Sequence, residues 1–140
     1  MTRQWPRTLL AVGLFVAAPP VVAHHSVPAV FDESRHITLT GTITKIQWIN
    51  PHIHMYLTSR EPDGKSTMWE IETLPTNWMR NAGITREAFL NKAADGEVVT
   101  VHANPARDTS LRLGYLMRIT YPDGHFFHVT GDPEAIASAK

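Results

Sequence analysis

The chain has 140 residues, with 13 basic and 13 acidic side chains and a formal net charge of zero. This balance argues against a nucleic-acid partner and against a polybasic contact with a membrane. The absence of cysteine excludes disulfide bonds, thiolate metal ligands and a lipid-modified cysteine anchor, so the fold has to be held by ordinary core packing.

The N-terminal segment has the pattern of a secretory signal. Two arginines stand within its first seven residues, followed by the apolar run Leu9–Ala18 and by residues that end at Ala23. The apolar run is too short to span a bilayer. We expect cleavage after Ala23, because a cut at the end of the apolar run would place Pro19 directly after the bond. Removal of 23 of the 140 residues leaves 117, enough for one periplasmic or secreted domain, and makes His24 the new N-terminus.

Residues 24–36 contain Pro28 and little periodicity, which predicts an irregular N-terminal arm. A disordered leader is the alternative. Phe31 is the side chain that would pin the arm to the domain, and Asp32 is expected to cap the turn at its end. Beyond the arm we expect a β-barrel domain over residues 37–131 and a flexible tail over residues 132–140.

A period-two pattern begins at Ile37, with apolar residues at odd positions and threonines at even positions as far as Thr44. The apolar face then moves to the even positions Ile46 and Trp48. Such a one-residue slip within a long strand indicates a β-bulge. Gly41 marks the place where the strand can bend over itself, as the first strand of a small barrel does when it serves both sheets.

Further strands are predicted by alternation and by the turns that bound them, over residues 52–59, 66–74, 97–103, 113–121 and 125–130. Two short helical pieces are predicted over residues 74–83 and 85–93, the second N-capped by Thr85. Three strands, a short helical segment and then further strands is the order of the OB-type barrel. We therefore predict an all-β fold with a short helical insertion, a small OB-like barrel of five to six strands. A β-sandwich is the alternative.

Several stretches of the chain resemble one known family. They are HHS after the signal, FD at residues 31–32, LTGTITKIQWINPH at 39–52, WEIE at 69–72, GEVVTVHANPARD at 96–108 and YPDGHFF at 121–127. In this order they resemble the DUF6152 family of small exported bacterial proteins over nearly the whole mature chain. The resemblance implies export and a compact β-domain, and it implies no mechanism because the family has no established activity. His54 stands where the family usually has an apolar or aromatic residue.

A histidine at the mature N-terminus can bind one metal ion through both its α-amino nitrogen and its imidazole. With one further imidazole, this set of three nitrogens suits Cu(II). The arrangement at His24 resembles, in ligand type, the histidine brace of certain exported copper proteins and copper oxygenases. His25 offers a second route through the amine, the intervening amide nitrogen and its own imidazole. The alternative is that two histidines on a flexible arm bind metals weakly and without function.

His52 and His54 are two apart on a predicted strand, so their side chains point the same way from bases about 6.6 Å apart and can both approach one ion. The alternative is that they are solvent-facing polar residues on a half-buried strand. Glu70 and Glu72 on a neighbouring strand could act as ligands or orient an imidazole. The predicted metal ligands are therefore His24 and His52, with His25, His54 and Glu72 as weaker candidates.

These patterns favour an exported, non-enzymatic β-barrel binding module, and Cu(II) is the ligand they point to. One alternative is a metal-free accessory module that recognises another exported protein or a glycan, and another is a copper-dependent oxidative enzyme. Hydrolytic chemistry has little support, because the chain has neither a Gly-x-Ser-x-Gly elbow nor a phosphate-binding glycine loop. The tryptophans at positions 48, 69 and 78 are expected in the core rather than as a sugar-binding platform. His36 and His102 have no evident partner.

Overall fold

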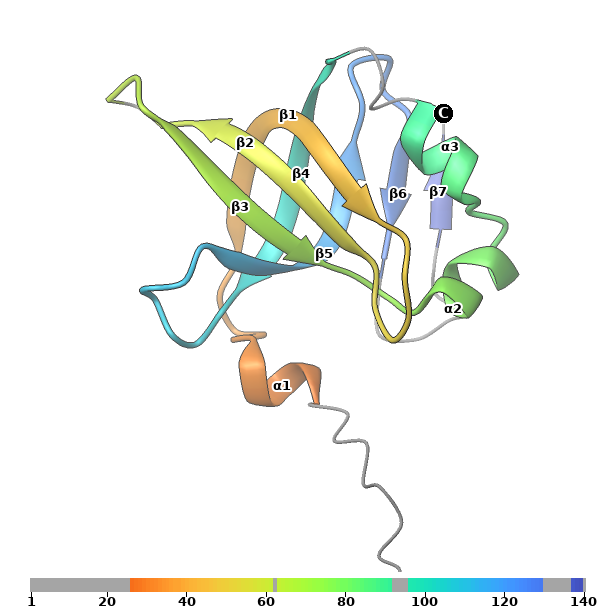
Figure 1. The fold of residues 1–140 in the computed structure, drawn as a ribbon, viewed down its shortest axis with the longest axis horizontal. Helices are drawn as coiled ribbons and strands as arrows, with labels where there is room; N and C mark the ends of the chain where they lie inside the picture. Colours follow the sequence, from red (N-terminus) through yellow and green to blue (C-terminus); the bar gives the residue numbers. More distant parts are fainter. Residues whose placement is uncertain (1–25, 62, 92–95, 130–136, 140) are drawn as a thin grey trace, which may run out of the picture.

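The computed structural model describes residues 26–61, 63–91, 96–129 and 137–139 (Figure 1). The expected signal segment and its cleavage site lie outside these residues. Along the chain the elements are α1 (Val27–Val30), β1 (Ile37–Gln47), β2 (His54–Arg60), β3 (Ser66–Glu72), α2 (Thr76–Asn81), α3 (Arg86–Asn91), β4 (Val98–Pro105), β5 (Leu113–Thr120), β6 (Phe126–His128) and β7 (Ala137–Ala139). Within the described ranges, no helix has the length and apolar character needed to cross a membrane.

Five strands close into a barrel in the order β1, β2, β3, β5, β4 and back to β1. These neighbours are antiparallel except β3 and β5, which pair in parallel. The first half of β5 pairs with β3, and its second half pairs with β6, which carries β7 in turn. The helices α2 and α3 stand between β3 and β4, as in the OB-type order. The predicted OB-like barrel is confirmed, and the β-sandwich alternative is wrong.

The long strand β1 joins both sides of the barrel, as its pattern predicted. Its first part pairs with β4 and its second part with β2, and both pairings include Gly41 and Thr42. The register with β2 slips between Ile43 and Lys45, so the predicted bulge is confirmed and lies at Thr44. Gly41 is needed where β1 pairs with β2 and β4 at once, because a Cβ there would lie 2.1 Å from the carbonyl oxygen of Thr58.

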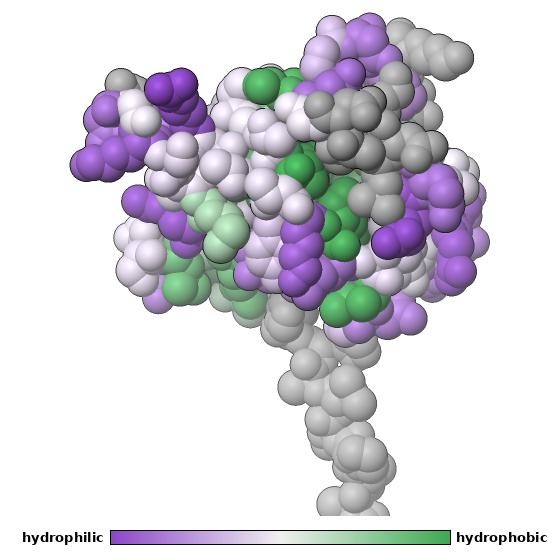
Figure 2. Space-filling view, turned by 45° about the horizontal axis from the view of Figure 1, so that its top comes forward, coloured by the Kyte–Doolittle hydropathy of each residue, from purple (hydrophilic) through white to green (hydrophobic). Residues whose placement is uncertain are grey.

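The alternating apolar side chains of the strands fill the barrel. Those that are fully buried include Ile53, Met55, Leu57, Ile71, Val99, Val101, Leu116 and Ile119. Met79 of α2 and Phe89 of α3 join this core, so the two helices cover one end of the barrel. Trp69 is buried, while Trp48 and Trp78 are partly buried against the core. The hairpin between β2 and β3 projects from the body and is hydrophilic at its tip (Figures 1 and 2).

The arm is attached to the barrel from α1 onward, so the disordered-leader alternative does not hold for residues 26–36. Phe31 is fully buried and forms a bridge with Ala106, and the amide of Arg107 donates to the carbonyl of Val30 over 2.9 Å. Asp32 caps the following turn as predicted, because its Oδ1 accepts from the amide and the hydroxyl of Ser34. The arm is less irregular than predicted, since α1 forms where proline stands in the first turn, a position that suits its fixed φ.

The end of the chain adds a strand to the sheet. Residues 137–139 of the segment expected to be a tail form β7, which pairs antiparallel with β6. The open edge of a sheet offers unpaired backbone donors and acceptors to any extended segment that reaches it. This pairing depends on the tertiary structure, so the local composition of the segment did not indicate it. Earlier in the chain, Thr85 caps α3 as predicted, because its hydroxyl accepts from the amide of Ala88 over 3.1 Å.

Candidate functional site

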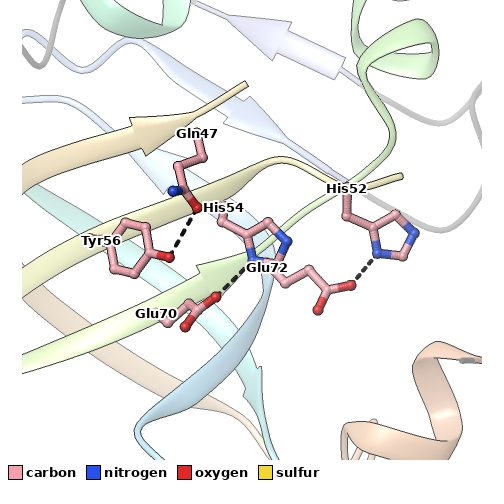
Figure 3. Close-up of polar contacts among 6 residues, drawn as sticks. All are labelled: Gln47, His52, His54, Tyr56, Glu70 and Glu72. Atoms are coloured by element: carbon pink, nitrogen blue, oxygen red, sulfur yellow. Dashed lines mark hydrogen bonds and ion pairs between the residues drawn. The ribbon is translucent and has the colours of Figure 1, made fainter. Parts of the chain in front are cut away.

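Two histidine–glutamate pairs lie side by side on the outer face of β2 and β3 (Figure 3). The register places His54 opposite Glu72 and Tyr56 opposite Glu70. Each imidazole contacts a glutamate on the neighbouring strand through Nδ1: His52 contacts Glu72, and His54 contacts Glu70 at 2.8 Å. The intervening residues at 53, 55 and 57 are buried in the barrel, so the alternation directs both histidines outward.

The glutamates set the chemistry that the imidazoles can offer. An ionised carboxylate only accepts hydrogen bonds, so in the neutral ring the proton stays on Nδ1 and the lone pair is on Nε2. This tautomer and this orientation are the ones that metal-binding histidines usually have, with a carboxylate behind the ring. Glu72 is buried and His52 is partly buried, with 5% and 15% of their side chains exposed. The predicted orienting role of Glu72 is therefore compatible with its position.

The described residues do not contain a complete metal centre. No group of three or more histidine, aspartate or glutamate side chains within them is placed to hold one ion. His52 and His54 share a face, as predicted, but each contacts its own carboxylate. The other two predicted ligands, His24 and His25, lie outside the described residues. Any metal site that uses His52 needs a ligand from that part of the chain or from a partner molecule.

A pocket of about 600 Å³ adjoins His52. The arm forms one wall with Val27 and Pro28, and α2 contributes Trp78. Glu33 of the arm also lines it, and the remaining lining residues come from the barrel strands and the segments that follow them: Leu74, Pro75, Asn104, Tyr115, Leu116, Met117 and Val129. Its size lies in the range of pockets that hold small ligands, and its mixture of apolar walls with a few polar groups is typical of them.

A second, more open hollow of about 700 Å³ lies beside the first. It shares His52, Pro75 and Trp78 with the first pocket and continues along the loop at Asn50 and the start of α2. The peptide bond between residues 50 and 51 in this loop is cis. His52 and Trp78 therefore line both depressions, and we call this surface the His52 groove.

Tyr115 connects the pocket with the His52–Glu72 pair. The parallel pairing of β3 with β5 places Tyr115 directly opposite Glu72, and its ring contacts that of Phe31 at a centroid distance of 5.3 Å. Burial raises the pKa of Tyr115 to about 12, and the negative charges of Glu72 and then Glu33 add to this effect. At neutral pH the phenol is therefore a hydrogen-bond donor at the floor of the pocket.

Three polar residues of the pocket were missed by the sequence patterns: Glu33, Asn104 and Tyr115. Glu33 and Asn104 come together because the amide of Asn104 reaches back to backbone carbonyls of the arm, including that of Arg35 at 2.9 Å. Tyr115 joins them only through the β3–β5 pairing. A polar Asn104 inside an otherwise apolar strand end was the one local signal that could have drawn notice.

A comparison with protein families found one match. The model of a family of unknown function, DUF6152, matches residues 12–114, which is more than half of the chain. Comparisons with curated proteins and with solved structures found no match.

Proposed function

The chain belongs to the DUF6152 family, whose function is unknown, and we propose that it is an exported binding module that holds Cu(II) at the His52 groove. The proposed ligands are the α-amine and imidazole of His24, after cleavage at Ala23, together with the imidazole of His52. His25 and His54 are secondary candidates, and Glu72 orients the His52 ring. In this proposal the protein carries or senses the ion and catalyses no reaction.

The position of the arm is the observation that supports this proposal most. Val27 and Pro28 line the same pocket as His52, and the buried Phe31 holds the arm in that place. His24 precedes Val27 by three residues, so the two Cα atoms are at most about 11 Å apart along an extended chain. Cleavage after Ala23 would therefore create an α-amine within reach of the pocket that His52 borders.

The chemistry of the available donors is consistent with Cu(II). Two imidazoles and one amine are nitrogen ligands, which Cu(II) binds more strongly than the other divalent first-row ions do. The contact between His52 Nδ1 and Glu72 places the metal-binding lone pair on Nε2. The protein has no cysteine. It therefore offers no thiolate ligand, the kind of ligand that would favour Cu(I) or zinc over Cu(II).

The test is a calorimetric Cu(II) titration, with electron paramagnetic resonance, of the chain that begins at His24. It is compared with a chain that carries one additional N-terminal alanine. We expect one tightly bound ion per chain, nitrogen coordination in the spectrum, and a loss of affinity of at least about tenfold when the alanine displaces the α-amine. Export is checked separately from the mass of the protein in a periplasmic fraction, which should correspond to a chain that starts at His24.

Two variants on β2 and the loop before it make the test specific. His52→Gln should weaken Cu(II) binding strongly, whereas His54→Gln, which removes the other histidine–glutamate pair at a secondary candidate ligand, should have a much smaller effect. Equal, weak binding by all four proteins would refute the copper site.

The metal-free alternative has one supporting observation of its own. The walls of the His52 groove are largely apolar and include Pro75 and a partly exposed Trp78, which could contact an extended segment of another exported protein or a glycan ring. Under this alternative, Trp78→Ala abolishes capture of such a partner, and the presence of Cu(II) has no effect on the interaction.

A further inference from the structure

Three side chains stand in one row across the outer face of the sheet, away from the His52 pair. The register pairs His102 of β4 with Arg118 of β5, and Arg118 with His128 of β6. Side chains of directly paired residues point to the same face with their Cβ atoms about 5 Å apart. Arg118 therefore lies between two imidazoles, an arrangement that only strand pairing produces.

A β-bulge and a hollow lie at this row. Ala103 of β4 pairs with Leu116 of β5, but the preceding residue of β4, His102, pairs with Arg118. Strand β5 therefore has one extra residue, Met117, that has no pairing partner on β4. Bulges bend a strand, redirect its side chains and are frequent next to functional sites. The hollow has a volume of about 350 Å³ and is lined by His36, His102, Met117, Arg118 and His128. The structure thus joins His36 and His102, for which the sequence indicated no partner.

The hollow offers hydrogen-bond donors and positive charge. The guanidinium of Arg118 is permanently charged and lies over the ring of Phe126, 4.0 Å from its centroid. The amide of Asn104 donates to the carbonyl of Arg35 and to His36 Nδ1, at 2.9 Å and 3.2 Å, so a neutral His36 keeps its proton on Nε2. Every imidazole has at least one N–H group whether or not it is protonated. None of the described residues that line the hollow is a carboxylate.

This arrangement favours an anion over a metal ion. A cation in the hollow would be repelled by the nearby charge of Arg118. The described part of the chain also has no group of three histidine or acidic side chains placed around a common point. An oxyanion, in contrast, would accept two parallel hydrogen bonds from the guanidinium and further bonds from the imidazoles on either side.

We propose that this hollow binds a small organic anion through a phosphate or carboxylate group, with Arg118 as the principal contact and His102 and His128 as flanking donors. Its volume is within the range of pockets that hold small organic ligands. Met117 supplies an apolar wall for the carbon skeleton. The proposed contacts include neither His24 nor His52, so the proposal does not depend on copper binding.

The test is a calorimetric titration of the protein with three probes: glycerol 2-phosphate, citrate and inorganic phosphate. We expect one of the two organic probes to bind with one molecule per chain and more tightly than inorganic phosphate. Binding of glycerol 2-phosphate identifies a phosphate ligand, and binding of citrate identifies a carboxylate ligand. Arg118→Gln should reduce the affinity by about tenfold or more, because a charged hydrogen-bonding partner is lost. Arg60→Gln, which removes the same charge from the end of β2, should have no effect.

Three results would overturn the proposal. They are the absence of binding by either organic probe, binding of inorganic phosphate as tight as that of both organic probes, and an equal loss of affinity in Arg118→Gln and Arg60→Gln. Circular dichroism and thermal melts establish that the variants are folded. If Arg118→Gln does not fold, the double variant His102→Ala/His128→Ala supplies the same test. It should lose affinity by about threefold or more, because both imidazole donors are removed.

Discussion

Replacement of Gly41 by alanine probes the place where β1 pairs with both β2 and β4. A Cβ at this position would lie 2.1 Å from the carbonyl oxygen of Thr58 and 2.9 Å from the Cα of Ser59. Real Cβ atoms essentially never come closer than 3.0 Å, and both neighbours are backbone atoms that cannot rotate away. The two strands would therefore have to move apart by about 1 Å at this point.

The expected cost combines two effects. Overpacking of a closely packed site typically costs about 1–3 kcal/mol. The separation also weakens the ladder at the pairs Gly41–Ser59 and Thr42–Thr58, at about 1 kcal/mol for each hydrogen bond lost. We expect a decrease of about 3–5 kcal/mol in the free energy of unfolding, a large part of the roughly 5–15 kcal/mol available to a domain. The melting temperature should fall by about 10–20 °C.

The assay is urea denaturation followed by circular dichroism, with Gly64→Ala as the matched control. Gly64 lies in the β2–β3 turn with φ +83°, and a Cβ added there would have no other atom within 4 Å, so alanine meets only backbone strain of about 1–2 kcal/mol. If Gly41→Ala costs less than Gly64→Ala, the close approach of β1 to β2 does not govern stability as argued.

Three further changes test the arm, the pocket and the helical insertion. Phe31→Ala should destabilise the protein by about 3–5 kcal/mol in chemical denaturation because the ring is fully buried, and a loss below about 1 kcal/mol would contradict a docked arm. Stability should decline as the pH rises from 10 through about 12. The pKa of Tyr115 is about 12 in the folded protein and about 10 in the unfolded chain, so the folded state favours the neutral phenol. The resulting stabilisation, about 2–3 kcal/mol, is fully present below pH 10 and is lost as the pH approaches the folded pKa. Tyr115→Phe should remove this part of the decline in urea midpoints measured across that range, and an unchanged decline would refute the assignment. Thr85→Ala should cost about 1 kcal/mol in thermal melts through loss of the cap on α3, whereas Thr85→Ser should retain it.

The N-terminal arm shows how a local pattern can indicate one contact and miss its context. An aromatic residue in a polar, proline-containing segment predicted that Phe31 anchors the arm, and this is confirmed. Where the arm docks was not predictable, because the bridge to Ala106 and the bond to Arg107 join residues more than seventy positions apart in the sequence. That docking is what places Val27 in the wall of the pocket.

The candidate site also contains residues that the sequence indicated and others that only the structure revealed. His52, His54 and Glu72 were named from the sequence because alternation indicates that the two histidines share a face, and the short turn between β2 and β3 indicates which strand lies beside them. Tyr115 was not found, because it reaches Glu72 across the parallel pairing of β3 with β5. No short-range pattern encodes a pairing between strands that are separated by two helices and another strand.

The sequence by itself determined the β-rich class, the bulge in β1, the cap at Thr85 and the common face of His52 and His54, because each depends on periodicity or on hydrogen bonds between residues close in the chain. The tertiary structure decided the pairing of β3 with β5 that closes the barrel, the position of the arm against the barrel, and the row formed by His102, Arg118 and His128. These features depend on which apolar faces pack best over the whole core and on how distant strands come into register. That choice is made by the summed packing energy of many residues, and no single segment of the chain contains it.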